Sequence, residues 1–227
     1  MEKTKSLPVL GIDDVIMMAP ELNAWAEMSA RAFGLYSGIN DAIKKSREKH
    51  GSVAHQASEI RQQMILMALI RAFAMMDREA TISLQSVYRF LCSPGALSAI
   101  KQTYANTEPI SSLSEAELVC VRAIEKFKAT YLAVDFKAFA RIQSFRNTGI
   151  AHISWPDAVK AKVTYHDVER LVRGCAEMSG QLMLMLFGRN DWPAEHLDTV
   201  HSESYHFWLA VITADHDGTL NPLTIDR

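Results

Sequence analysis

Apolar residues recur at intervals of three and four along most of this 227-residue chain, and this spacing constrains the fold more than any other feature. Side chains at such offsets share one face of an α-helix, which can then pack against a neighbouring element. No stretch sustains the apolar–polar alternation that is typical of β-strands. The pattern therefore predicts an all-α protein, a bundle of long antiparallel helices with a short C-terminal extension.

Proline and glycine divide the first third of the chain. Pro20 disfavours helix at the residue before it and suits a first helical position, so a long helix is expected to begin there. Gly51 is expected to end that helix. The next helix, over residues 54–76, carries apolar residues on every side, which predicts a central position in the bundle.

Polar caps place the helices of the middle of the chain. Ser83 is a suitable N-cap for a short helix over 84–91, and a second short helix is expected over 96–104. From Glu115 one helical pattern continues for more than thirty residues, up to Phe145.

The last long helix has clear signals at both ends. Thr164 and Asp167 predict its N-terminus, and Gly188 predicts its end after Phe187. Its inward-facing residues are expected to be Val168, Leu171, Val172, Cys175, Met178, Leu182 and Met185.

The character of the sequence changes near residue 190. We therefore divide the chain into a helical domain over 1–190 and an extension over 191–227. Aromatic and apolar residues over 205–212 predict a short helix or strand in the extension. This element is expected to pack on the bundle or on a partner subunit.

Composition narrows the class of protein. Hydrophobic residues make up 48% of the chain and charged residues 22%, which are values of a folded protein. The net charge of −2 gives no global positive field, so any contact with nucleic acid has to be local. Three widely spaced cysteines suit a reducing compartment. No signal peptide and no apolar run long enough for a bilayer are found, so we expect a cytoplasmic protein without membrane contact.

Histidines near the C-terminus raise the question of a metal site. His196, His201 and His206 follow one another at steps of five residues, which places them about 140° apart around a helix. Such a set does not form a ligand face, so no metal is expected. No glycine-rich phosphate loop occurs either, and we expect no cofactor.

The most distinctive polar residues lie in the segment FRNTGIAH, residues 145–152, inside an apolar helical pattern. On a helix, Arg146 and His152 would be roughly 9 Å apart along the axis and about 120° apart around it. They could not touch each other, but they could converge on one phosphate beside the amide of Asn147. A lone histidine near a helix end is also often a purely structural residue.

This segment resembles the R-x(4–6)-H signature of the HEPN superfamily (higher eukaryotes and prokaryotes nucleotide-binding), in which a polar residue follows the arginine. Two further blocks, Asp77 to Leu91 and Thr164 to Val172, occur in the same order as in the abortive-infection U-type branch, a bacterial phage-defence family. The resemblance covers roughly residues 55–190. It departs from the family pattern at Gly149, where many members carry a longer side chain.

The resemblance implies a HEPN-like bundle that acts as a metal-independent RNA endonuclease, of the toxin–antitoxin or antiviral-defence type. Its R-x(5)-H site would lie at the cleft of a homodimer, and an antitoxin protein is a possible partner. Arg146 would hold the scissile phosphate, His152 would act as general acid or base, and Asn147 would orient either group.

Further cations near the motif are candidates for substrate binding, namely Arg141, Lys160 and Lys162. The alternative is a non-catalytic helical dimer, a binding or scaffold protein in which the same residues bridge helices. A serine or cysteine hydrolase finds no support, because no G-x-S-x-G motif occurs and no cysteine has a plausible histidine partner nearby in the sequence.

Overall fold

The computed structural model describes residues 10–46, 51–77, 80–107, 113–145 and 163–216. These residues form eight α-helices and no β-strand, so the predicted all-α class is confirmed. None of these helices combines the length and the apolar character needed to cross a lipid bilayer. The helices are α1 (Ile12–Lys45), α2 (Ser52–Met75), α3 (Leu84–Leu91), α4 (Ala96–Thr107), α5 (Leu113–Leu132), α6 (Phe136–Phe145), α7 (Tyr165–Phe187) and α8 (Pro193–His216).

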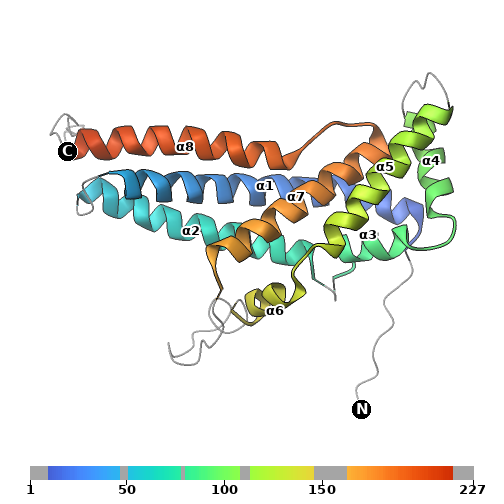
Figure 1. The fold of residues 1–227 in the computed structure, drawn as a ribbon, viewed down its shortest axis with the longest axis horizontal. Helices are drawn as coiled ribbons and strands as arrows, with labels where there is room; N and C mark the ends of the chain where they lie inside the picture. The colour runs from blue at the N-terminus through green and yellow to red at the C-terminus, as the bar shows by residue number, and fades with distance from the viewer. Residues whose placement is uncertain (1–9, 47–50, 78–79, 108–112, 146–162, 217–227) are drawn as a thin grey trace, which may run out of the picture.

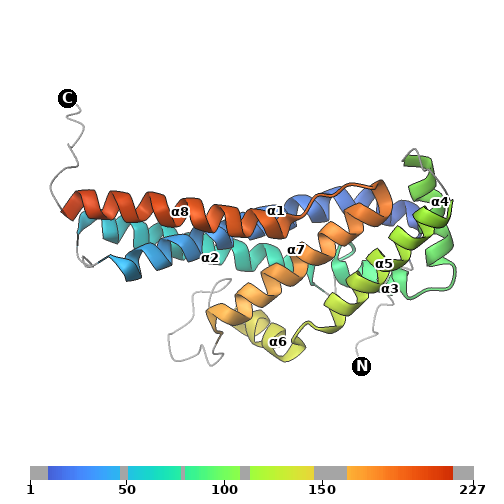
Figure 2. The same cartoon turned by 45° about the horizontal axis from the view of Figure 1, so that its top comes forward.

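Three long helices lie lengthwise against one another, with α1 between α2 and α8 (Figure 1). Helix α2 runs antiparallel to α1, whereas α8 runs parallel to it. Helices α5 and α7 cross this layer at an incline, and the short helices α3 and α4 close one end. Both views place α6 below α7, on the opposite side of the molecule from α8 (Figure 1, Figure 2).

The first helix begins earlier than expected. Helix α1 starts at Ile12, where the Gly11 N–H donates to the Asp14 carboxylate at 2.8 Å, and it continues through Pro20. The prediction of a start at Pro20 is therefore wrong. Proline removes one backbone hydrogen bond, but the proline ring is exposed, and continuing the helix lets Val15 and Met18 join the core.

The expected single helix from Glu115 to Phe145 is also wrong, because the chain breaks between α5 and α6. Asp135 caps the new helix: its Oδ1 accepts hydrogen bonds from the N–H groups of Lys137 and Ala138, both at 2.9 Å. Turning α6 away allows the ring of Phe139 to stack on Phe73 of α2, with ring centroids 5.1 Å apart. Burial of this aromatic pair compensates for the interrupted helix.

Predictions from local capping are confirmed. The Ser83 hydroxyl accepts the Ser86 N–H at 3.2 Å and starts α3. Thr164 and Asp167 form a reciprocal capping box at the start of α7, and Gly188 ends that helix with a φ of 63°, which favours glycine. All seven residues expected to face inward from α7 are buried: Val168, Leu171, Val172, Cys175, Met178, Leu182 and Met185.

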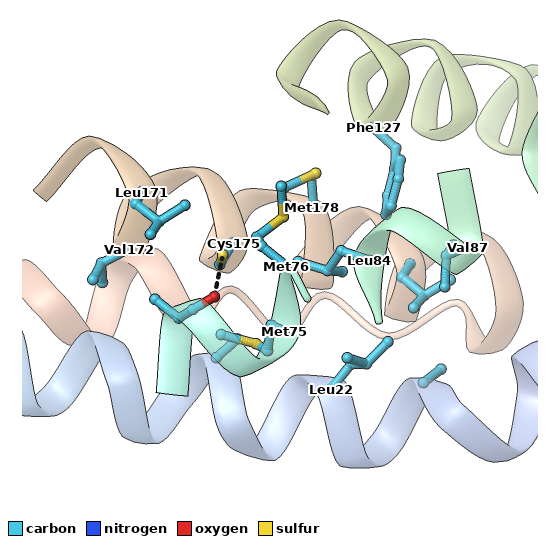
Figure 3. Close-up of a cluster of buried hydrophobic side chains, with 14 of the residues drawn as sticks. Leu22, Met75, Met76, Leu84, Val87, Phe127, Leu171, Val172, Cys175 and Met178 are labelled. Atoms are coloured by element: carbon cyan, nitrogen blue, oxygen red, sulfur yellow. Dashed lines mark hydrogen bonds between the residues drawn. The ribbon is translucent and has the colours of Figure 1, made fainter. Parts of the chain in front are cut away.

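The core forms where α2, α3, α5 and α7 meet above α1 (Figure 3). Met75, Leu84 and Phe127 are almost completely buried there. The Cys175 thiol donates to the Ala72 carbonyl at 3.7 Å, and burial raises the pKa of this thiol to about 12. The cysteine therefore serves as a packing residue rather than as a nucleophile.

A polar network ties α7 to α1 inside this apolar environment. The Ser179 hydroxyl donates to Asn23 Oδ1 at 2.9 Å, and Asn23 Nδ2 donates to the Asp191 carboxylate at 3.0 Å. The network links two helices and the turn that leads into α8. Buried polar groups with such partners fix the relative position of the elements that carry them.

Helix α2 does not have the central position predicted for it. Its inner side, with Ala68, Leu69 and Ala72, is buried against α1 and α7. Its outer side is exposed, although it carries large apolar residues: Ile60, Leu66, Met67 and Ile70. Helix α1 is the central helix instead.

The C-terminal region forms a 24-residue helix, longer than the short helix or strand expected at 205–212. Helix α8 packs closely on α1 because Gly34 and Gly38 bring the two backbones together. A Cβ atom at Gly34 would lie 2.6 Å from the Leu197 carbonyl oxygen, and one at Gly38 would lie 2.5 Å from that of His201. Neither position has room for a side chain.

We expect Gly38→Ala to lower the free energy of unfolding by about 1–3 kcal/mol, because the added methyl forces two backbones apart. Gly174→Ala is the matched control, since no atom lies within 4 Å of its Cβ position. The control is expected to raise the free energy by up to about 1 kcal/mol through helix propensity. Urea titrations of both variants measure the difference, and equal effects would contradict the close contact.

Candidate functional site

The residues predicted to act directly on a substrate, Arg146, Asn147 and His152, lie outside the described residues, as do Lys160 and Lys162. Arg141 is described. Arg146 follows the last residue of α6 directly in the sequence, and Lys162 lies three residues before Tyr165, the first residue of α7. Helices α6 and α7 are therefore the two elements that flank the predicted catalytic segment.

An ion pair joins these two helices. The Arg141 guanidinium lies 3.2 Å from Asp167 Oδ1, and about 43% of the arginine side chain stays exposed. The other carboxylate oxygen of Asp167 accepts the Thr164 N–H at 3.0 Å, and its own N–H donates to the Thr164 hydroxyl at 3.1 Å. The backbone hydrogen bond from Thr164, the Thr164 hydroxyl and Arg141 together lower the pKa of Asp167. One carboxylate thus caps α7 and anchors α6.

A cleft of about 270 Å³ lies between α6, α7 and the end of α5. This volume is near the lower end of the range for small-molecule sites and suits a group of the size of one nucleobase. The floor is apolar and the rim is charged. The floor residues include Val134, Ala138, Phe139, Ile142 and Leu171, and the rim residues include Asp135, Asp167, Arg170 and Arg173.

The two arginines on the rim differ in their partners. Arg173 is held by Glu169 at 3.0 Å and by Asp198 at 2.8 Å, so its charge is already neutralised. Among the described residues, no carboxylate forms an ion pair with Arg170, which is exposed. Arg170 is therefore the rim cation with most capacity left for an anionic ligand.

The carboxylate of Asp135, also on the rim, accepts hydrogen bonds from backbone N–H groups. Hydrogen bonds from the N–H groups of Ala138 and Lys137, together with the charges of Arg141 and Arg170, lower the pKa of this carboxyl. The carboxylate therefore stays ionised at neutral pH. It caps α6 and is not available as a general base.

An exposed aromatic ring marks the first turn of α7. Tyr165 stacks on Tyr36 of α1 with ring centroids 5.2 Å apart, and about 64% of the surface of Tyr165 is exposed. Burial raises the pKa of Tyr36, so this supporting ring stays neutral. Arg61 of α2, whose charge acts on Tyr36, is held by Asn40 at 2.9 Å. A solvent-facing ring on a rigid support is a suitable surface for stacking an unpaired base.

The C-terminal histidines lie in the contact between α8 and α1 or on the surface. His196 lies 4.0 Å from Glu27, and His201 lies 3.3 Å from Asp41. His206 is exposed beside Tyr205. Within the part of the chain that the structure describes, no group of three or more His, Cys, Asp or Glu side chains is arranged to hold a metal ion.

No protein-family model matches this chain, no curated protein is significantly similar to it, and no solved structure matches it. The HEPN resemblance therefore stays a prediction from sequence motifs, whereas the all-α class is established.

Sequence reasoning identified Arg141 but missed Arg170, Asp135 and Tyr165. A signal for Arg170 was present: it lies three residues after Asp167 and four before Gly174, so these residues share one helix face beside the apolar stripe of α7. Asp135 gave only a weak signal, because aspartate occurs both in exposed helix positions and at N-caps.

We expect Asp167→Asn to destabilise the protein at pH 7, on the order of 0.5 kcal/mol, because the pair with Arg141 is partly exposed to solvent. The pKa of Asp167 is lowered by folding, so its stabilisation is present above the unfolded value of about 3.9 and is lost as the pH falls through the folded value. The difference from wild type should therefore vanish in acid. Urea titrations between neutral pH and acid test this, with Glu203→Gln on the exposed face of α8 as control. A difference that is independent of pH would contradict the assignment.

Proposed function

We propose that this protein is a metal-independent RNA endonuclease that uses Arg146 and His152. One observation carries the proposal: the arginine–histidine motif begins at the residue after α6, and α6 is fixed to α7 beside a base-sized cleft lined by Arg170, which forms no ion pair within the described residues. Cations next to a pocket for one base suit an unpaired base and its phosphate, as in the recognition of single-stranded RNA. The catalytic groups themselves are assigned from the sequence motif.

The proposed reaction needs no metal and no protein nucleophile. The ribose 2′-hydroxyl attacks the adjacent phosphorus, a P–O2′ bond forms and the P–O5′ bond breaks. His152 takes the 2′-hydroxyl proton or supplies a proton to the leaving 5′-oxygen, because imidazole titrates near neutral pH. Arg146 stabilises the charge on the phosphoryl oxygens, and Asn147 orients the phosphate or the imidazole. The products are a 2′,3′-cyclic phosphate and a 5′-hydroxyl.

Residues of α6 and α7 support the binding of RNA next to the segment that carries Arg146 and His152. Arg141 keeps a large part of its side chain in solvent while Asp167 holds it, so it can contact a phosphate without losing its position. Arg170 supplies a second cation and Tyr165 a stacking surface. With a net charge of −2, these local contacts rather than a global field would bind RNA.

A dimer belongs to the proposal for a geometric reason. One arginine and one histidine six residues apart on a helix point in different directions. A two-fold axis near the motif would supply each group twice and let groups from both subunits act on one phosphate. A toxin of this kind is expected to have an antitoxin protein as its natural partner.

We expect the purified protein to cleave labelled RNA in the presence of EDTA, with 2′,3′-cyclic phosphate ends. His152→Ala and Arg146→Ala should each lower the rate by about 100-fold or more, because each removes a group that acts in the transition state. Gel analysis and mass spectrometry of the products measure both properties.

Matched controls are His206→Ala on the surface of α8 and Arg122→Ala on the surface of α5, both expected to keep full activity. A folded protein that leaves a wide set of RNAs intact would instead indicate the alternative, a non-catalytic helical binding or scaffold protein. Cleavage that persists in both motif variants would refute the assigned residues.

We expect Arg170→Gln to raise KM for RNA about threefold to tenfold with little change in kcat, because the guanidinium contacts phosphate in both ground and transition states. The effect should shrink at high salt, where counterions screen the contact. Arg122→Gln, an exposed arginine outside the cleft, is the control. Equal KM values for the two variants would remove the cleft from the binding site.

A further inference from the structure

The outer side of α2 carries a second apolar pattern that the fold of the single chain does not use. Apolar and amide residues follow one another at steps of four and three, the spacing of the a and d positions of a coiled coil. We name this row the α2 seam. It consists of Gln56, Ile60, Gln63, Met67, Ile70 and Ala74.

The seam is distinct from the face of α2 that packs in the core. Ala68 accepts the Ser29 hydroxyl of α1 through its carbonyl, and Phe73 stacks on Phe139 of α6. These contacts lie on the buried side. The seam residues Ile60, Met67 and Ile70 keep 37%, 42% and 43% of their surface exposed, and Leu66 beside them keeps 37%. Within the part of the chain that the structure describes, one apolar face of α2 is thus buried and the other stays partly exposed.

The charge pattern indicates what kind of partner fits the seam. The six seam residues are uncharged, and two of them are glutamines. Two charged residues border the row: Glu59, which lies 3.3 Å from His55, and the half-buried Arg71, which lies over the Trp25 ring of α1. The outer face of α8, in contrast, carries Glu195, Glu203 and His206. A neutral row offers no attraction to an acidic or basic partner. It is complementary to another neutral apolar row with the same spacing, which a second copy of this chain supplies.

The apolar surface continues beyond the end of the seam. Ala74 borders a groove of about 230 Å³ that Trp25 of α1 and Ile82 also line. Met28 of α1 is about half exposed as well. A stable dimer buries roughly 800 Å² per subunit, which is more than one helix face provides. The groove extends the seam toward that area.

We propose that the α2 seam is the interface of a homodimer, in which two copies pack their seams together and place side chains into each other's grooves. The buried apolar surface drives the association. Gln56 and Gln63 restrict the register, since polar residues at seam positions disfavour other alignments. The inference goes beyond the proposed ribonuclease: the seam is present whether or not the protein cleaves RNA, and only the expectation of a dimer is shared.

The first test measures molar mass by light scattering over a series of concentrations. Wild type is expected at twice the chain mass of 25.4 kDa. Met67→Glu combined with Ile70→Glu should give the single-chain mass and weaken the dimer at least about 100-fold, because two charges would be buried without partners. Helical circular dichroism shows whether the variant is folded.

Matched controls place the same charge on apolar residues outside the seam. Phe207 on α8 is 59% exposed and Leu118 on α5 is 48% exposed. Phe207→Glu and Leu118→Glu should remain dimers. A monomeric wild type would overturn the proposal, as would a dimer that survives the double seam variant.

A second test does not depend on a destabilising charge. Gln63→Cys in a Cys92→Ser background should cross-link rapidly with a short bismaleimide, whereas Ser202→Cys on α8 should not. Equal yields at the two positions would overturn the seam. Failure of the ribonuclease proposal is distinguishable. A seam dimer without nuclease activity refutes only the enzyme. A monomer that cleaves RNA refutes the seam and the two-fold site, but not the roles assigned to Arg146 and His152.

Discussion

The close contact between α1 and α8 is the constraint on which the rest of the architecture depends. Small residues recur every four positions along one face of α1, and all of them are buried: Ala26, Ala30, Gly34, Gly38 and Ala42. This face lets the two backbones approach until a Cβ no longer fits at the glycines. With one side of α1 occupied in this way, its other sides take α2 and α7. The polar network of Asn23 and Ser179 then fixes α7.

The position of α7 in turn determines the candidate site. Asp167 caps the first turn of α7 and also holds Arg141 of α6, so the position of α6 depends on the first turn of α7. The cleft beside this pair combines an apolar floor with the charge of Arg170, an arrangement that suits a base and its phosphate. A small number of fixed cations can therefore serve a protein whose overall charge is slightly negative. Under the proposed function, RNA binding would depend on these local contacts rather than on global charge.

Helix α2 illustrates why apolar content alone does not determine burial. Met67 and Ile70 are as hydrophobic as the buried Leu69, and all three lie within one turn of the helix. Only the direction of each side chain relative to α1 and α7 separates them. An apolar residue that the single chain leaves exposed is consistent with a further partner, because exposed apolar rows are unfavourable in water.

The sequence by itself determined the all-α class, the caps at Ser83, Thr164 and Gly188, and the inward face of α7. These features depend on residues within about four positions of one another, where helix geometry alone fixes the contacts. Only the tertiary structure decided that α1 continues through Pro20, that the chain breaks at Asp135 and that one side of α2 stays exposed. Each of these outcomes balances a local cost against burial by residues far away in the sequence, such as the stacking of Phe139 on Phe73. The sequence placed Arg170 on one helix face with Asp167, but only the tertiary structure showed that this face lines a cleft formed with α5 and α6.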